Sequence, residues 1–189
     1  MLASVQRKLC LSTAEQLVQS QHWAEAVKLF EKAEALGKPG QSLDRELAPA
    51  YAANGQFPQS IDRYQKLLAK NPKDIDLEIN LAWTLMESGD SQTAEQHLKN
   101  AIAKQPSNQS AISNLAVLMT RTGRTPEAFE LFKQVVSESA AHHNIGVLML
   151  DLGQEEAARV AFENAATSPG ASTQSKQFLA ALQSPGVTR

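Results

Sequence analysis

The 189-residue chain lacks several features that mark other classes of protein. Cys10 is its only cysteine, so the chain cannot form an internal disulfide or a cysteine-rich zinc site. No apolar run approaches the ~18 residues that a membrane-spanning helix needs. The 18 lysines and arginines nearly balance the 20 aspartates and glutamates, so no basic excess favours nucleic acid. We therefore expect neither membrane insertion nor nucleic-acid binding.

Aromatic residues are also scarce, at 5% of the chain. Alanine, leucine, glutamine, glutamate and lysine dominate, and these residues favour helices. A hydrophobic content of 42% is enough for a substantial core. Arg7 and Lys8 interrupt the N-terminal stretch where a secretory signal would be apolar. We expect a cytoplasmic protein, or a periplasmic one if a signal was removed ahead of Met1.

Glycines and aromatic residues recur at a fixed interval. The turn glycines Gly55, Gly89 and Gly123 are equally spaced, and Gly153 follows after a slightly shorter step. A column of aromatic or leucine residues keeps the same steps: Phe30, Tyr64, Leu98, Phe132 and Phe162. Independent residue types that repeat in step indicate a tandem array of one structural unit.

Each unit is predicted to form two helices. In the clearest copy, Leu81 and Leu85 precede Gly89, and Leu98 and Ile102 follow it, at spacings typical of a helical face. A glycine between the two runs suits a helix end, where the backbone often needs a positive φ. The alternation typical of strands is absent, so we predict an all-α chain.

The order of these residues within a period of about 34 residues resembles the tetratricopeptide repeat (TPR) family. The resemblance covers about residues 7–168, and we predict a single domain over residues 1–189. The predicted repeats are 7–40, 41–74, 75–108, 109–138 and 139–168, and the first lacks the turn glycine. The resemblance implies a right-handed superhelical solenoid of helix-turn-helix repeats with a concave face for ligands.

Three segments depart from the regular pattern. The fourth repeat is four residues short, which we interpret as a trimmed second helix around Val135–Glu138. Pro49 lies inside the first helix of the second repeat, where proline removes a backbone donor. We expect there a kink or a helix that starts near Leu47. Residues 171–183 have the pattern of an amphipathic helix that caps the exposed end of the array.

Motifs of catalysis are missing from the sequence. It has no H-E-x-x-H, C-x-x-C or G-x-S-x-G pattern. His142 and His143 are adjacent, so a helix would direct them about 100° apart and away from a shared metal. We therefore predict a protein that is not an enzyme, with no catalytic residue, metal site or cofactor.

The resemblance implies that ligand contacts lie on the first helix of each repeat. Carried over residue by residue, it selects Asn80, Asn114 and Asn144, one at the same position of three repeats. An amide donates and accepts hydrogen bonds, so this column could pair with the backbone of an extended peptide. The alternative is that asparagine is simply common at this position of the family.

Trp83 follows Asn80 by three residues, at a family position that is usually polar or small. Tryptophan often carries binding energy, so we predict an exposed anchor for a ligand. The alternative is that Trp83 packs against the neighbouring repeat. The other predicted contacts are Met86, Val117, Arg121 and His143.

We therefore predict a non-catalytic module that binds a peptide segment of a partner protein in a concave groove. One alternative is a structural protein that self-associates or scaffolds a complex through its ends. Another is an accessory module of a larger enzyme. The partner and the oligomeric state are left open.

Overall fold

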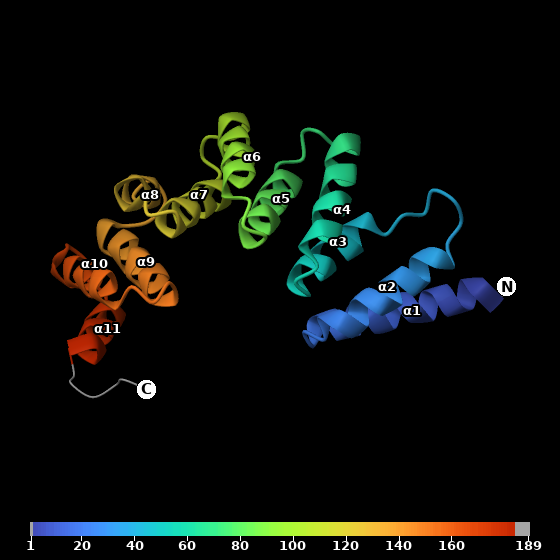
Figure 1. Cartoon of the computed structure of the whole chain (residues 1–189), viewed down its shortest axis with the longest axis horizontal. Helices are drawn as coiled ribbons and strands as arrows, with labels where there is room; N and C mark the ends of the chain where they lie inside the picture. The colour runs from blue at the N-terminus through green and yellow to red at the C-terminus, as the bar shows by residue number, and fades with distance from the viewer. Residues whose placement is uncertain (1, 184–189) are drawn as a thin grey trace. The chain divides into compact units, whose positions relative to one another are not determined.

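A computed structural model describes residues 2–183. This part of the chain contains eleven α-helices and no strand (Figure 1). The predicted all-α fold, a succession of helical repeats, is confirmed. None of the described helices combines the length and the apolar character that a bilayer crossing requires.

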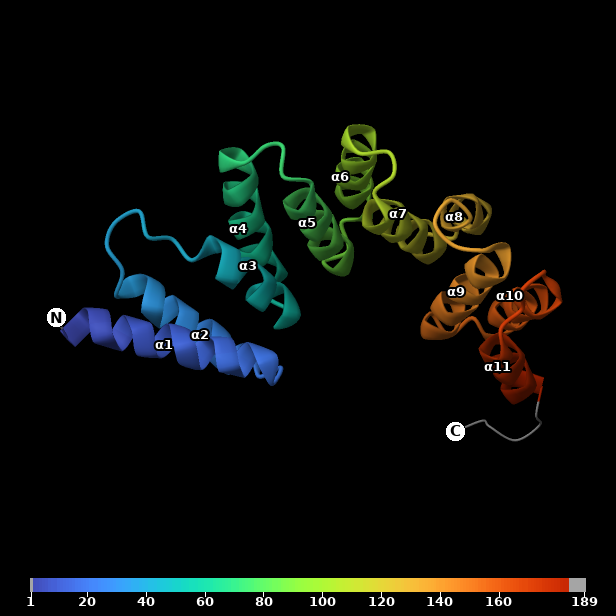
Figure 2. The same ribbon diagram turned by 180° about the vertical axis from the view of Figure 1, so that it is seen from behind.

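The helices follow one another as pairs joined by three-residue turns (Figures 1 and 2). The five pairs are α1 (Leu2–Gln19) with α2 (Trp23–Ala35), α3 (Asp44–Ala53) with α4 (Phe57–Lys70), α5 (Ile75–Glu87) with α6 (Ser91–Lys104), α7 (Gln109–Arg121) with α8 (Thr125–Phe132), and α9 (Glu138–Asp151) with α10 (Glu155–Thr167). A last helix, α11 (Thr173–Gln183), follows.

The helices gather into two compact units. Unit 1 ends at His97 and unit 2 begins at Leu98. Because this division lies inside α6, it does not follow a predicted repeat boundary. The single domain over residues 1–189 stays a prediction.

The turns within the pairs share one hydrogen-bond pattern. After α5, Gly89 has a φ of 92°, and the next amide, of Asp90, donates to the carbonyl of Leu85 at 2.9 Å. This bond spans six residues, as in a Schellman motif, and requires a left-handed residue before the donor. The other turn glycines also have positive φ. In the first repeat, which lacks the glycine, Gln21 takes the same conformation with a φ of 61°.

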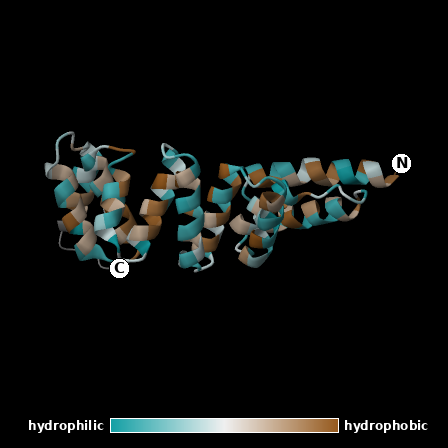
Figure 3. Cartoon of the chain, turned by 90° about the horizontal axis from the view of Figure 1, so that it is seen from above, coloured by the Kyte–Doolittle hydropathy of each residue, from teal (hydrophilic) through white to brown (hydrophobic). Residues whose placement is uncertain are grey.

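Apolar faces of neighbouring helices form the core of each unit. Most helices carry both polar and apolar faces (Figure 3). In unit 1, Phe30, Leu47 and Tyr51 belong to one buried cluster. In unit 2, Phe162 is fully buried and its ring stacks on Phe178 of α11, with centroids 5.1 Å apart. The last helix therefore covers the aromatic residue of the last pair.

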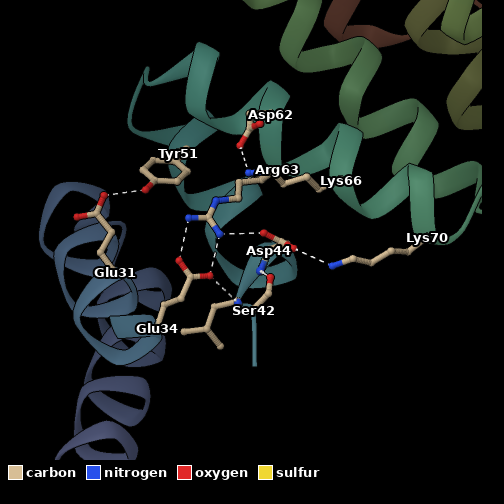
Figure 4. A network of polar contacts seen from close by, with 10 residues as sticks. Glu31, Glu34, Ser42, Asp44, Tyr51, Asp62, Arg63, Lys66 and Lys70 are labelled. Atoms are coloured by element: carbon tan, nitrogen blue, oxygen red, sulfur yellow. Dashed lines mark hydrogen bonds and ion pairs between the residues drawn. The ribbon is translucent and has the colours of Figure 1, made fainter. Parts of the chain in front are cut away.

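A network of charged groups joins α2, α3 and α4 (Figure 4). Arg63 of α4 donates to Glu34 at 2.7 Å and to Asp44 at 2.8 Å. Lys70 reaches the other oxygen of Asp44 at 3.4 Å, and the Tyr51 hydroxyl donates to Glu31 at 2.7 Å. These contacts hold α3, which carries part of the candidate site, against the helices on either side.

The two irregular repeats differ from the others in the length of α8 and in the proline inside α3. The second helix of the fourth repeat, α8, ends at Phe132 and has 8 residues, against 14 in α4 and α6. The missing turn thus follows Phe132, close to the segment expected to be trimmed. The helix that contains Pro49 starts at Asp44 rather than near Leu47, and Pro49 lies inside it. A proline here withholds a donor from the Arg45 carbonyl without ending the helix.

Candidate functional site

A narrow exposed stripe runs along α5. Its members are Asp76, Asn80, Trp83 and Glu87, at steps of four, three and four residues. Such steps keep side chains on one face of a helix. Eight other residues of α5, from Leu77 to Met86, are buried. The stripe is therefore the only face of α5 available to a ligand within the described structure.

The first helices of the other repeats carry residues at the same register. We call these residues, together with the four on α5, the inner stripe. On α3, one repeat earlier, it comprises Glu46, Pro49 and Ala53, all exposed. In unit 2, residues at this register are exposed or half-buried; they are Ser110, Asn114, Val117 and Arg121 on α7, and Ala140, Asn144, Val147 and Asp151 on α9. The amide column thus ends at α5, because Glu46 takes the equivalent position on α3.

Within unit 1, Asn80 and Trp83 line a hollow of about 260 Å³ with residues of α3 and α4. Pro49 and Ala53 of α3 form one wall, and Tyr64 contributes from α4. Trp83 is 42% exposed, so its indole lines the hollow and is also accessible to solvent. An indole half open to solvent beside an exposed amide can offer both apolar contact and hydrogen bonds.

Two further hollows of unit 1 adjoin the first. A larger one, of about 540 Å³, lies between the end of α1, the start of α2 and α3, where Trp23 and Pro49 are among its lining residues. A smaller one, of about 220 Å³, is lined by Asn80, Asp76 and Pro49. Pro49 lines all three, so the hollows are arranged around that residue.

Tyr64 is the main titratable group buried beneath this surface. It is 5% exposed, and burial raises the pKa of its hydroxyl to about 12. The phenol therefore stays neutral at physiological pH. The described residues contain no cluster of three or more histidine, cysteine or carboxylate side chains suited to a metal ion.

Met86 is not accessible for the ligand contact predicted for it. It is 5% exposed, and the equivalent residue of the next repeat, Thr120, is 1% exposed. Residue 86 is three positions after Trp83, which turns it about 60° from that residue towards the core. We correct the expected site by leaving Met86 out.

His143 is also engaged within the protein. Its Nδ1 lies 3.0 Å from the Ser175 hydroxyl of α11, and its ring makes T-shaped contacts with those of Phe162 and Phe178. Burial lowers the pKa of the imidazole. His143 thus helps to hold α11, a role that the sequence could not indicate because Ser175 is distant in the chain and lies on another helix.

The remaining residues of the predicted site lie in unit 2. Asn114 and Val117 are half-buried and Arg121 is exposed, all on α7. Asn144 is half-buried on α9, a helix that packs against α7. The structure therefore brings Asn80 together with Trp83 in unit 1, and places the other two asparagines on neighbouring helices of unit 2.

Sequence reasoning missed the contribution that Pro49 and Ala53 of α3 make to this surface. Pro49, Ala53 and Glu46 line the hollows beside Trp83 or Trp23. The signal was present, because Pro49 stands one full period before Trp83, and Glu46 stands one full period before Asn80. A proline inside a helical pattern indicates a break in the helix, and the local pattern does not show that it lines a surface.

Comparison with known proteins agrees with this fold. Three family models, each described as tetratricopeptide repeat, match residues 11–75, 64–96 and 85–144. Cellulose synthase operon protein C of Pseudomonas fluorescens (strain SBW25) is 28% identical over 91 residues. Those residues make up 48% of this chain and 7% of that protein, so the chain spans a small part of this relative.

Solved structures with this fold are similar over most of the chain. A thermophilic TPR protein of Thermus thermophilus matches 93% of this chain and 98% of its own, with a TM-score of 0.62 and 16% identity. For a TPR protein of Parabacteroides merdae, the match covers 94% of this chain and 72% of that protein, with a TM-score of 0.65 and 14% identity. For YrrB, described as a TPR protein with an unusual peptide-binding site, the match covers 89% of each chain, with a TM-score of 0.57 and 17% identity.

Proposed function

The chain belongs to the tetratricopeptide repeat family, and from this premise we propose that it binds a peptide segment of a partner protein without catalysing a reaction. The TPR fold supports a protein-interaction or scaffold module. The observation that carries the finer proposal is the inner stripe. On α5 it leaves Asn80 and Trp83 exposed beside an apolar hollow, and it repeats an asparagine on α7 and α9.

Each part of this stripe suits a peptide ligand. An asparagine amide can bond to the main chain of an extended peptide whatever its side chains are. Trp83 offers a large apolar surface for one side chain of that peptide. YrrB, with a similar fold, is described as having a peptide-binding site, which is consistent with such a role here. Val117 and Arg121 supply apolar and polar contacts on α7.

The test compares partner capture by the wild-type chain and by a variant with Asn80→Ala, Asn114→Ala, Asn144→Ala and Trp83→Ala. Lysate proteins retained by each would be identified by mass spectrometry, with folding verified by circular dichroism. We expect a partner that the wild type captures and the variant loses by at least about tenfold, the usual effect of removing an anchor residue.

A matched control removes similar groups from second helices. It carries Gln65→Ala, Asn100→Ala, Asn164→Ala and Val160→Ala, all at exposed positions of α4, α6 and α10. This control should retain the partner. Equal capture by wild type, variant and control would contradict binding at the inner stripe.

A structural role is a second candidate, and one observation favours it. Leu2, Val5 and Leu9 on α1 are 77%, 62% and 67% exposed, and their spacing places them along one face. Exposed apolar stripes of this kind often mark association sites. Sedimentation over a range of concentrations, with Leu2→Gln, Val5→Gln and Leu9→Gln as the comparison, should reveal self-association that the variant loses.

A further inference from the structure

We propose that the three hollows of unit 1 bind an extended segment of a partner protein in which a bulky apolar residue adjoins lysine or arginine. This inference rests on the proposed function, because it names the kind of peptide that unit 1 receives. It goes further by choosing one part of the inner stripe and one ligand chemistry. Shape, charge and register each support it.

The shape of this surface favours a bulky apolar side chain. Pro49 and Ala53 line the hollow of about 260 Å³ together with Trp83. The same two residues of α3 line the hollow of about 540 Å³ together with Trp23. These walls are apolar and partly open to solvent. A volume of about 540 Å³ lies within the range of pockets that hold organic ligands, so it can accept a large aliphatic or aromatic side chain.

The charge around these hollows is acidic. Five carboxylates line them, namely Glu15, Glu46, Asp74, Asp76 and Glu87. The one cationic residue in the linings is Arg45, whose guanidinium lies 3.6 Å from Asp74. Glu15 and Glu46 make no ion pair with any described residue. Since the whole chain has a net charge of only −2, the excess is local and attracts a cationic partner.

The register brings the acidic and apolar groups onto one path. Glu15, Pro49 and Trp83 occupy equivalent positions of successive first helices, one per repeat. Glu46 and Asn80 form the neighbouring column. A peptide that places an apolar residue between Pro49 and Trp83 would therefore present its next residues to Glu46 or Glu15. The asparagine amide remains available for the peptide backbone.

The inference can be tested with a phage-displayed library of random peptides selected on the immobilised full chain. The most enriched sequences would be synthesised with a fluorescent label, and their dissociation constants measured by anisotropy. We expect lysine or arginine beside tryptophan, phenylalanine, leucine, isoleucine or methionine to be enriched over the unselected library. Affinity should fall as salt rises, because exposed charges are screened.

Substitutions then assign the contacts. Glu15→Gln and Glu46→Gln should each weaken binding about two- to fivefold, as expected for partly exposed ion pairs. Trp83→Ala should weaken it about tenfold or more. Two matched controls at exposed carboxylates should leave it unchanged: Glu25→Gln on α2, outside the hollows, and Glu155→Gln on α10, outside the inner stripe.

The outcomes separate this inference from the proposed function. Enriched peptides that are acidic or show no charge preference would overturn the inference and leave peptide binding intact. So would peptides whose affinity depends on Asn114 and Asn144 but not on Glu46 or Trp83. A library from which no peptide is enriched would overturn both proposals.

Discussion

Gln21 has a backbone conformation that the other repeats assign to glycine. Its φ of 61° matches the turn glycines, of which Gly55 has 73°, and the amide after it, of His22, donates to Leu17 at 2.8 Å. A side chain in this conformation brings its Cβ close to the carbonyl oxygen that follows. The first repeat therefore keeps the turn of the family without its glycine, at a cost in strain.

Replacing this residue should stabilise the protein. We expect Gln21→Gly to raise the free energy of unfolding by about 0.5–1 kcal/mol, because glycine tolerates a positive φ. Chemical denaturation followed by circular dichroism would measure the change. Gln16→Gly, an exposed position within α1, makes the same chemical change and should instead lower stability by about 1 kcal/mol. The same sign for both variants would refute the interpretation.

One position of the inner stripe holds a different residue type in successive repeats. Trp83 is replaced by Pro49 one repeat earlier and by Val117 one repeat later. All three are at least partly exposed. A position that tolerates proline, tryptophan and valine is not held by core packing, since buried positions accept changes of volume poorly. The variation is better explained by the surface that each repeat offers.

At the scale of helices, the junction of α2, α3 and α4 depends on ionised carboxylates. Hydrogen bonds from Arg63 hold the pKa of Glu34 below its ordinary value of 4.5, against the opposing effect of burial. Burial alone would raise the pKa of Asp44. Hydrogen bonds from Ser42, Arg63 and Lys70 outweigh it, so this pKa also lies below its ordinary value of 3.8. Both groups favour the folded state when they are ionised.

This direction sets the pH dependence of stability. A depressed pKa contributes stability above the unfolded value, and that contribution is lost as pH falls through the folded value. We expect the free energy of unfolding to decrease below about pH 5. Arg63→Gln should cost about 2 kcal/mol near neutral pH and flatten the acidic decline, because Glu34 loses its main partner and Asp44 loses one of its three. Denaturation at a series of pH values would measure both effects.

An exposed ion pair provides the control for that experiment. Lys66 and Asp62 lie 2.6 Å apart on α4, and both side chains are more than half exposed. Lys66→Gln should change stability by at most about 0.5 kcal/mol and leave the pH profile as it is. An Arg63→Gln profile parallel to that of the wild type would show that the network does not set the acid sensitivity.

At the scale of the whole molecule, the main helix contacts within each unit join helices that are neighbours or next neighbours in the chain. Repeat proteins with such contacts behave as nearly one-dimensional arrays, in which a local defect has local consequences. Gly146 allows this to be examined. A Cβ at this residue would lie 2.8 Å from the ring of Phe162, so α9 and α10 approach closely there.

We expect Gly146→Ala to destabilise unit 2 by about 1–3 kcal/mol, because Phe162 must shift within a packed core. Hydrogen exchange measured by mass spectrometry should show amides of α9 and α10 exchanging about tenfold faster or more, because local opening there becomes easier. Amides of α1 to α4 should keep their protection. A uniform loss of protection through all helices would contradict local behaviour.

Much of the fold could be predicted because the same residue pattern recurs in every repeat. Each predicted repeat range overlaps a helix pair, and the glycine at its turn has a positive φ in four of the five. The last helix, Thr173–Gln183, also lies within the segment predicted to be helical at the end of the array. The candidate site was predicted less completely. Asn80 and Trp83 are exposed, whereas Met86 is buried and His143 is bound to Ser175.

The sequence by itself determined the helices, their turns and the register of their faces. These features depend on backbone preferences and on the helical period, which act over a few residues and recur in every repeat. Only the tertiary structure decided which face residues reach solvent. Burial of Met86, the contact of His143 with α11 and the hollows around Pro49 each depend on a neighbouring helix. Distant residues set the environment there, and no local pattern records it.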